Sequence, residues 1–418
     1  MDTSKRLPSF PRRACDQLRV ALFSGNYNCV KDGANQALNR LVGYLERQGA
    51  AVRVYSPTVQ EPAFEPAGTL VSVPSVPVPR RSEYRVALGL TPRPRADLER
   101  FRPNILHVSA PDPLGYAGLK FADVNGIPVV GSVHTRFETY FKYYALGGLE
   151  GWVRRYLTHF YNRCRQVYVP SDCMVKLLRG DGVTSEIRTW SRGVDRTLFN
   201  PSRRDLDWRR SLGIADDEVV ILFVGRVVME KGLKPFADTL ERLASTGIPH
   251  RILVVGDGPA REWLAQRLPK AVFTGYLSGE NLARAYASSD VFFNPSTTET
   301  FGNVTIEAMA SGLPTVCARA TGSNSIVRDG ETGFLIDQTD TRALCGVLGA
   351  LASEGDMRRG MGVAARDASA VYDWEAVLSA VHRHYVDARA SHAATAPAIE
   401  PAPVPVFARN SSEAGWSL

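Results

Sequence analysis

The hydrophobic pattern of the chain alternates between short apolar runs and longer stretches with helical spacing. In the first half, apolar runs occur at residues 18–25, 104–110, 126–134 and 166–172, with helix-like segments between them. Short apolar runs bounded by turn residues are typical of buried strands, and strands that alternate with helices form parallel, doubly wound sheets. The pattern therefore predicts an α/β fold.

The same alternation begins again in the second half of the chain. A strand-like run at residues 219–224 is followed by others at residues 250–255 and 291–296. We therefore expect two such domains and a final helix. The boundaries that we predict are 18–202 for the first domain, 203–370 for the second and 371–389 for the helix.

Three segments do not fit this alternation. Residues 57–85 are rich in Pro and Val, and this spacing of prolines favours an extended loop over a helix. Residues 1–17 have the character of a disordered leader, and residues 390–418 form an Ala/Pro-rich tail that we also expect to be disordered.

Composition narrows the class of protein. The 418 residues are 44% hydrophobic and 22% charged, which is typical of a globular protein. No run of apolar residues is long enough for a membrane-spanning helix, and the run after Arg12 and Arg13 is too short for a signal peptide. The six cysteines show no C-x-x-C motif, which favours reduced thiols in a cytosolic enzyme.

The net charge of +7 is unevenly distributed. Residues 1–200 carry 28 Lys and Arg against 17 Asp and Glu, whereas residues 201–418 carry 22 against 26. This asymmetry suggests an anionic partner for the first half, although scattered, solvated charges explain it equally well.

Residues 294–316 are the most informative segment, reading NPSTTETFGNVTIEAMASGLPTV. A strand precedes the turn Phe301-Gly302-Asn303, and a helix is expected to begin near Asn303. The free N–H groups at that helix start would form an anion site. Glu299 would lie just before the helix and Glu307 about one turn inside it, so the two carboxylates could bind opposite ends of one ligand.

A cationic pair follows the strand at residues 219–224. Arg226 comes directly after Gly225, and Lys231 follows in the sequence EKG. An Arg and a Lys delivered together at the end of a strand can clamp a diphosphate.

Two further positions are candidates in the first domain. The helix starting near Gly33 offers backbone amides to a phosphate, although the loop before it is not a G-x-G-x-x-G motif. His134 lies at the carboxyl end of a strand, where open α/β sheets bind their ligands.

Metal binding is not expected. Asp205-Leu206-Asp207 is formally a D-x-D motif, but it lies in a probable linker helix and is read as solvated surface. No His or Cys cluster has metal-ligand spacing.

These motifs together resemble those of the retaining GT-B glycosyltransferases of family 4. The resemblance rests on E-x7-E between Glu299 and Glu307 and on GR-x3-EKG around Arg226. It covers roughly residues 18–389. The stretches VSVPSVPVPRRSEYRVAL and HTRFETYFKYY resemble in particular GDP-mannose-dependent α-mannosyltransferases and sulfolipid-synthase-like lipid glycosyltransferases.

The resemblance implies two Rossmann-like domains facing a central cleft and a role for each candidate residue. Arg226 and Lys231 would neutralise the diphosphate, Glu307 would bind the ribose and Glu299 the transferred sugar. His134 would contact that sugar from the first domain. The remaining implied contacts to the donor are made by the loops at Gly33, at Gly225, at Gly275 and Tyr276, and at Phe301, Gly302 and Asn303.

The implied activity is transfer of a hexose, with retention, from a GDP- or UDP-linked donor. No metal or other cofactor and no nucleic acid is implied. The acceptor is expected to be a membrane lipid at the cytoplasmic face. Peripheral binding to an anionic membrane would use basic residues beside aromatic ones, namely Arg80, Arg81, Arg85, Lys142, Arg154 and Arg155.

Other readings stay open. The acceptor could be soluble or a polysaccharide, in which case the arginines are merely solvated. A sugar-nucleotide epimerase shares the GT-B architecture, and a non-catalytic binding protein is a further alternative that the intact clamp and glutamates disfavour.

Overall fold

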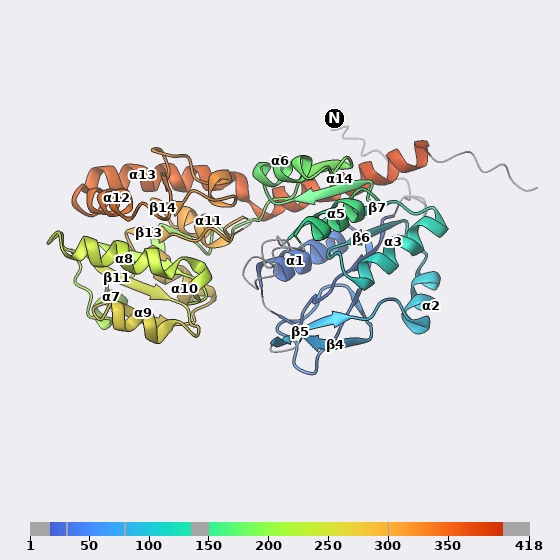
Figure 1. The fold of residues 1–418 in the computed structure, drawn as a ribbon, viewed down its shortest axis with the longest axis horizontal. Coiled ribbons are helices and arrows are strands. Elements are labelled where there is room, and N and C mark those ends of the chain that lie inside the picture. The colour runs from blue at the N-terminus through green and yellow to red at the C-terminus, as the bar shows by residue number, and fades with distance from the viewer. Residues whose placement is uncertain (1–16, 31, 79–80, 135–149, 300, 396–418) are drawn as a thin grey trace, which may run out of the picture.

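The computed structural model describes residues 17–30, 32–78, 81–134, 150–299 and 301–395. These residues form two α/β domains that lie side by side (Figure 1). Nearly all of the expected leader and the end of the expected tail lie outside the described residues.

A seven-stranded parallel sheet forms the centre of the first domain, in the order β3-β2-β1-β6-β7-β8-β9. Its strands are β1 (Arg19–Phe23), β2 (Ala51–Ser56), β3 (Thr69–Ser72), β6 (Ile105–Val108), β7 (Val129–Ser132), β8 (Gln166–Val169) and β9 (Glu186–Thr189). The helices around it are α1 (Gly33–Arg47), α2 (Pro92–Phe101), α3 (Pro113–Asn125), α5 (Glu150–Tyr161) and α6 (Asp172–Gly180).

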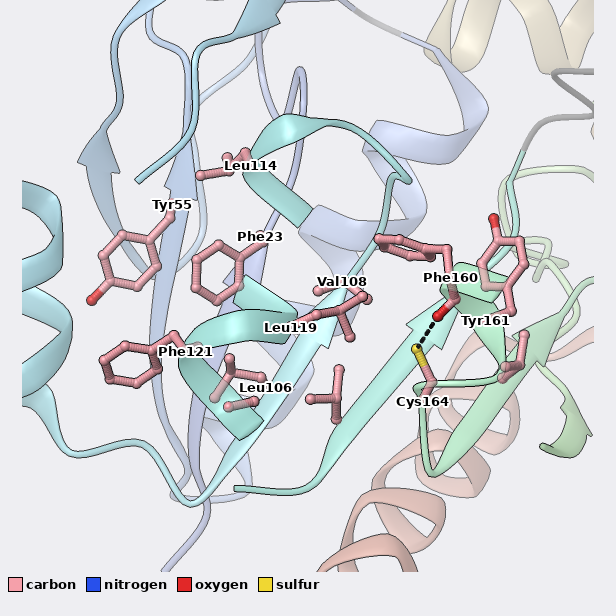
Figure 2. Packing of buried hydrophobic residues seen from close by; sticks show 14 of the residues in the cluster. Phe23, Tyr55, Leu106, Val108, Leu114, Leu119, Phe121, Phe160, Tyr161 and Cys164 are labelled. Atoms are coloured by element: carbon pink, nitrogen blue, oxygen red, sulfur yellow. Dashed lines mark hydrogen bonds between the residues drawn. The ribbon is translucent and has the colours of Figure 1, made fainter. Parts of the chain in front are cut away.

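Strand β1 shows why this sheet is covered on both faces. Its alternate residues point to opposite sides, so Ala21 and Phe23 join one buried cluster, and Val20 and Leu22 join another. On the first face, the ring of Phe23 stacks on Tyr55 at a centroid distance of 5.2 Å and packs near α3 (Figure 2). A strand that is buried on both faces is apolar along its buried part, which in β1 is Val20 to Phe23, as the sequence pattern indicated.

The second domain has a six-stranded parallel sheet in the order β12-β11-β10-β13-β14-β15. Its strands are β10 (Val220–Val224), β11 (Arg251–Val255), β12 (Val272–Gly275), β13 (Val291–Asn294), β14 (Thr315–Ala318) and β15 (Gly333–Ile336). The helices are α7 (Leu206–Ser211), α8 (Leu233–Ala244), α9 (Arg261–Arg267), α10 (Gly279–Ala287), α11 (Asn303–Ala310), α12 (Thr341–Ser353) and α13 (Gly355–Ala368). The prediction of two doubly wound α/β domains is confirmed.

Both sheets change winding direction at one point. In the first sheet the reversal lies between β1 and β6, and in the second it lies between β10 and β13. Open parallel sheets bind ligands in the crevice outside the carboxyl ends of the strands at such a point. The turn after β10 carries Arg226, and the loop after β13 carries Glu299, so the second reversal coincides with the strongest sequence motifs.

Helix α14 (Trp374–Thr395) connects the two domains (Figure 1). It starts in the second half of the chain, yet its residues Val377, Val381 and Tyr385 belong to the buried cluster that contains β1. Its first turn is also tied to α1, through an ion pair between Glu375 and Arg47 with an N–O distance of 2.8 Å. The helix therefore crosses back onto the first domain.

Two expectations about secondary structure were wrong in detail. Residues 57–85 are not only an extended loop, because β3 lies there and a hairpin of β4 (Ser75–Val78) and β5 (Arg81–Ala87) forms from the Val-rich part. Helix α14 passes the expected end at residue 389 and continues to Thr395. Contacts of its last turns, from Arg165 to Ser391 and from His392 to the carbonyl of Gly126, hold residues that we expected to be disordered.

Candidate active site

The segment between β13 and α11 has the geometry that its sequence indicated. Helix α11 begins at Asn303, and Gly302 caps it with a φ of +108°, which only glycine adopts without strain. A Cβ atom at Gly302 would lie 3.1 Å from Oε2 of Glu299. The carboxylate of Glu299 is thus folded over the start of the helix, where the free N–H groups and the positive end of the dipole favour negative charge.

The neighbouring Phe301 has a structural part in this arrangement. Its ring is buried and meets Tyr372 edge to face at a centroid distance of 5.7 Å. This packing holds Phe301 in place beside Gly302, so the ring itself is not available to a ligand.

The cationic pair lies at the same edge of the sheet. The Nζ atom of Lys231 is 3.2 Å from Oε1 of Glu299, and both side chains are partly buried. Arg226 follows Gly225 at the end of β10, is exposed, and has no ion-pair partner among the described residues. The structure therefore brings Lys231 and Glu299 into direct contact and leaves Arg226 open to a ligand.

Glu307 lies one turn into α11 and faces a tyrosine. The hydroxyl of Tyr286 donates to Oε2 of Glu307 at 3.0 Å, and also approaches the carbonyl of Val304 at 3.2 Å. Burial raises the pKa of Glu307 to about 7, with a smaller rise from the charge of Glu299, while the hydrogen bond from Tyr286 acts in the opposite direction. Tyr286 is a site residue that the sequence analysis did not identify.

The expected base-binding loop lies on the same domain. Gly275 ends β12, and the side chain of Tyr276 after it is 67% exposed. An exposed aromatic ring at the carboxyl edge of the sheet is available for stacking. Among the described residues, no contact holds this ring against the other site residues.

The first domain approaches the same place through α1. A Cβ atom at Gly33 would lie 2.5 Å from Nδ2 of Asn303, so the first residue of α1 and the first residue of α11 face each other across the two domains. The Oδ1 atom of Asp32 caps α1 by accepting from the backbone N–H of Asn35 at 2.8 Å. The two helix N-termini therefore converge, and the first-turn N–H groups that the Asp32 carboxylate leaves free are candidate donors to an anionic ligand.

His134 lies just beyond β7 and is bound on both ring nitrogens. Its Nδ1 atom is 2.7 Å from a guanidinium nitrogen of Arg192, and its Nε2 atom is 2.8 Å from the hydroxyl of Ser132. Burial, followed by the charges of Arg192 and His107, lowers the pKa of His134 well below the usual range. His134 is therefore neutral and already engaged.

Arg192 is the second residue that the sequence analysis missed. It lies in the segment WSRGVD, shortly before the predicted boundary between the domains at residue 203. The signal in the sequence that could have identified Arg192 is an arginine in the short segment before the domain boundary.

Two other kinds of feature are absent from the described residues. Within the described ranges, no three His, Cys, Asp or Glu side chains are arranged to hold a metal ion. No described helix is long and apolar enough to span a membrane.

Comparison with known protein families agrees with this geometry. Residues 31–198 match the model described as Glycosyltransferase Family 4, and residues 218–354 match Glycosyl transferases group 1. A curated relative, the sulfoquinovosyl transferase SQD2 of Arabidopsis thaliana, is 32% identical over 88% of this chain and 74% of its own length. The chain belongs to the family 4 glycosyltransferases.

Other members of this glycosyltransferase family are similar over most of the chain. The GDP-mannose-dependent alpha-mannosyltransferase of Mycolicibacterium smegmatis is 33% identical over 88% of this chain and 97% of its own. The alpha-monoglucosyldiacylglycerol synthase of Streptococcus pneumoniae is 28% identical over 76% of this chain and 75% of its own. The expected resemblance to family 4, including the mannosyltransferases and lipid glycosyltransferases, is confirmed, and the protein is a hexosyltransferase that acts on nucleotide sugars.

Solved structures agree on the fold. The sucrose-phosphate synthase of Thermosynechococcus elongatus superposes with a TM-score of 0.75, at 21% identity, over 90% of this chain and all of that one. The GT-B architecture is therefore confirmed.

Proposed function

We propose that this glycosyltransferase moves a hexose, with retention of anomeric configuration, from a GDP- or UDP-linked donor to a membrane lipid. The main support for a nucleotide-sugar donor is the contact between Lys231 and Glu299, which lies beside two converging helix N-termini. Cation, carboxylate and backbone donors at one place suit a ligand that combines a diphosphate with a hydroxyl-rich sugar.

The residues divide the reaction between them. Arg226 and Lys231 stabilise the negative charge that grows on the diphosphate as its bond to the sugar breaks. Glu299 accepts from hydroxyls of the transferred sugar, and Glu307 accepts from those of the ribose. The acceptor oxygen then bonds to the anomeric carbon, its proton passes to the departing phosphate, and the bonding electrons leave with the nucleoside diphosphate.

We expect this chemistry to proceed without a metal or other cofactor. In this proposal, the positive charges that balance the phosphates come from side chains instead of a metal ion. Arg226 is exposed and so can bind the phosphates. Retention is proposed on the basis of family membership.

The proposal that the acceptor is a lipid is based on an exposed surface of the first domain. On α5, the exposed residues Trp152, Arg155 and His159 are spaced three and four residues apart and so share one face of the helix. Trp152 is 62% exposed, and its ring stacks on Tyr156 at a centroid distance of 6.0 Å. An exposed tryptophan beside a basic residue is suited to the interface of an anionic bilayer.

The structure changes which basic residues matter for this surface. Arg154 is ion-paired with Asp181, and Arg85 is hydrogen-bonded to Ser75, so neither is freely available. Arg80, the side chain of Arg81, and Lys142 lie outside the described residues. Arg155 is therefore the described residue on which we place the electrostatic part of the docking.

The relatives support the same acceptor. One of them is named for a product built on diacylglycerol. We place the enzyme at the inner face of the membrane because its five described cysteines, Cys29, Cys164, Cys173, Cys317 and Cys345, are free thiols, as expected in a reducing compartment.

A direct assay tests this function. The purified protein is incubated with a panel of GDP- and UDP-hexoses and with vesicles that contain diacylglycerol and anionic lipid. We expect one donor to raise the melting temperature by binding, and a glycosylated lipid with the donor's anomeric configuration to form. Free nucleotide with no glycosylated product would contradict the proposal, and glycosylation of soluble acceptors only would contradict its lipid part.

A further inference from the structure

Arg192 is a buried cation whose charge the protein compensates only in part. Its side chain is 4% exposed, and it forms no ion pair with any described residue. Burial lowers its pKa to about 10, which still leaves the guanidinium charged at neutral pH. Keeping a charge inside a protein without an ion pair is costly, so a function that needs this guanidinium is the simplest reason for its presence.

The protein does, however, hold the guanidinium in place. One N–H group points to Nδ1 of His134, and the cation lies over the ring of Trp190 at 5.5 Å from its centroid. Because an arginine only donates, Nδ1 of His134 must be the acceptor. His134 is therefore the neutral tautomer that carries its proton on Nε2, and it donates that proton to the hydroxyl of Ser132.

The chain of hydrogen bonds continues from Ser132 into the core. The Oγ atom of Ser132 is 2.7 Å from Nε2 of His107, and Nδ1 of His107 is 2.5 Å from the hydroxyl of Tyr385 on α14. Ser132, His107 and Tyr385 are at most 1% exposed. We call this series, from His134 through Ser132 and His107 to Tyr385, the buried chain. It links the guanidinium to the helix that joins the two domains.

Arg192 also lies beside the proposed donor site. Asp32 is the acidic residue whose charge acts on it, and Asp32 directly precedes Gly33. Gly33 in turn faces Asn303 at the start of α11. The guanidinium thus lies in the part of the first domain near the start of α1, which faces α11 of the second domain.

Both ring nitrogens of His134 are occupied within the protein, whereas most N–H groups of Arg192 have no partner among the described residues. We propose that Arg192 donates hydrogen bonds to oxygen atoms of the transferred sugar, and that the buried chain positions it. This inference rests on the proposed function, since it assigns one more contact to the same donor. It gives the sugar a cationic partner from the first domain, opposite the carboxylate of Glu299.

The competing explanation is that Arg192 only stabilises the connection between the domains. Arg192→Ala and Arg192→Lys separate the two explanations when donor kinetics and nucleoside diphosphate binding are both measured. We expect Arg192→Ala to lower kcat/KM for the nucleotide sugar by about 100-fold, as loss of a charged hydrogen bond does, while the bare nucleoside diphosphate binds normally. Added guanidinium ion should restore part of the activity of Arg192→Ala but none of that of Arg192→Lys, which leaves no space for it.

Each other outcome has a defined meaning. Equal activity of Arg192→Ala and the wild type would overturn the inference. Weakened binding of the bare diphosphate would instead assign Arg192 to the phosphates and overturn the contact with the sugar. A wild type that transfers no sugar would overturn the proposed function and this inference with it, whereas a wild type that transfers sugar no faster than Arg192→Ala would overturn the inference alone.

The positioning role has its own test. Tyr385→Phe removes the end of the buried chain, and Ser132→Ala breaks its middle. Tyr168→Phe is the matched control, because Tyr168 is buried and stacks on Tyr385, but its hydroxyl donates to Gln166. We expect kcat/KM for the donor to fall several-fold in Tyr385→Phe and further in Ser132→Ala, with no fall in Tyr168→Phe.

A spectroscopic readout distinguishes positioning from loss of stability. In nitrogen NMR of the histidine-labelled enzyme, His134 should show a proton on Nε2 and none on Nδ1 across neutral pH. Ser132→Ala should alter the Nε2 signal, and Tyr168→Phe should leave it unchanged. A His134 signal with the proton on Nδ1, or donor kinetics that do not distinguish Tyr385→Phe from Tyr168→Phe, would contradict the positioning role.

Discussion

Lys231 and Glu299 form an ion pair with an N–O distance of 3.2 Å, although 68 residues separate them in the sequence. The two residues were assigned to different ends of the donor, the lysine to the diphosphate and the glutamate to the sugar. In the proposed binding mode, their contact brings the binding positions for the diphosphate and for the sugar next to each other. It also means that the lysine is partly neutralised until a donor arrives.

The first prediction concerns Glu299. Glu299→Ala removes an acceptor for the sugar hydroxyls, so we expect kcat/KM to fall by roughly 100-fold or more. Binding of the bare nucleoside diphosphate should not weaken, and it should tighten slightly because Lys231 is freed from its partner. Calorimetry with the diphosphate and steady-state kinetics with the full donor measure the two effects. Near-normal turnover of Glu299→Ala would show that the site is wrongly assigned.

The second prediction concerns the clamp. Arg226→Ala and Lys231→Ala each leave phosphate charge uncompensated, so both should weaken nucleoside diphosphate binding. Lys234→Ala is the control, since Lys234 lies on α8 nearby and is paired with Asp238 instead. Activity should also persist in EDTA because side chains supply the positive charge. Strict dependence on added Mg²⁺ or Mn²⁺ would count against this reading.

The third prediction uses the titration of Glu307. Its pKa in the folded protein, about 7, lies above the ordinary value of 4.5. The folded state therefore holds this proton more tightly than the unfolded state, and the contribution of Glu307 to stability should fall as pH rises from about 4.5 to about 7. Glu307→Gln keeps an oxygen for the hydroxyl of Tyr286 and cannot ionise, so the melting temperature of this variant should depend less on pH in that range.

The same group should make nucleotide binding depend on pH in the opposite direction. An ionised Glu307 accepts ribose hydroxyls better than a protonated one, so affinity should rise as pH increases from about 6 to about 8. Glu307→Gln should show no such rise. An identical pH dependence in the wild type and Glu307→Gln would exclude a role of this carboxylate in nucleotide binding.

The fourth prediction concerns the contact across the domains. Gly33→Ala places a methyl group against the amide of Asn303, and the flexible end of that side chain must move away. We expect donor binding to weaken by a few-fold, since the amide is displaced within the anion site. In a double-mutant cycle, Gly33→Ala should cost less when Asn303 is already Ala, because the clash is gone. Additive effects would show that the two residues do not meet in solution.

The sequence predicted those features that local chemistry determines. The helix beginning at Asn303 and the cationic pair after β10 follow from turn residues, periodicity and charge, and they lie where these signals placed them. The hairpin of β4 and β5 was missed because its prolines obscure the strand signal, yet Pro77 can be accommodated in a two-stranded edge pairing.

The contacts that the sequence did not reveal are those between distant segments. Tyr286 meets Glu307, and Arg192 meets His134, only after the chain has folded, and neither pair has a local spacing rule. In the sequence, Tyr286 lies among residues with helical spacing, and Arg192 lies shortly before the predicted domain boundary at residue 203. Only the buried partner of each residue shows that it belongs to the site. Which polar residues are buried together is difficult to predict from a sequence.

The last prediction concerns the membrane surface on α5. Vesicles with anionic lipid should bind the protein in a flotation assay, and binding should weaken as salt rises because exposed charges are screened. Trp152→Ala removes the interfacial ring, and Arg155→Glu replaces attraction by repulsion, at about 1 kcal/mol for each well-placed charge. The combined variant should lose vesicle binding and activity on lipid while its donor binding stays intact. Arg342→Glu on α12 changes an arginine in the second domain that is also exposed, and this variant should bind vesicles normally. If the wild type does not float with anionic vesicles at low salt, or if Arg342→Glu loses binding as much as the α5 variant does, the surface on α5 is not the docking site.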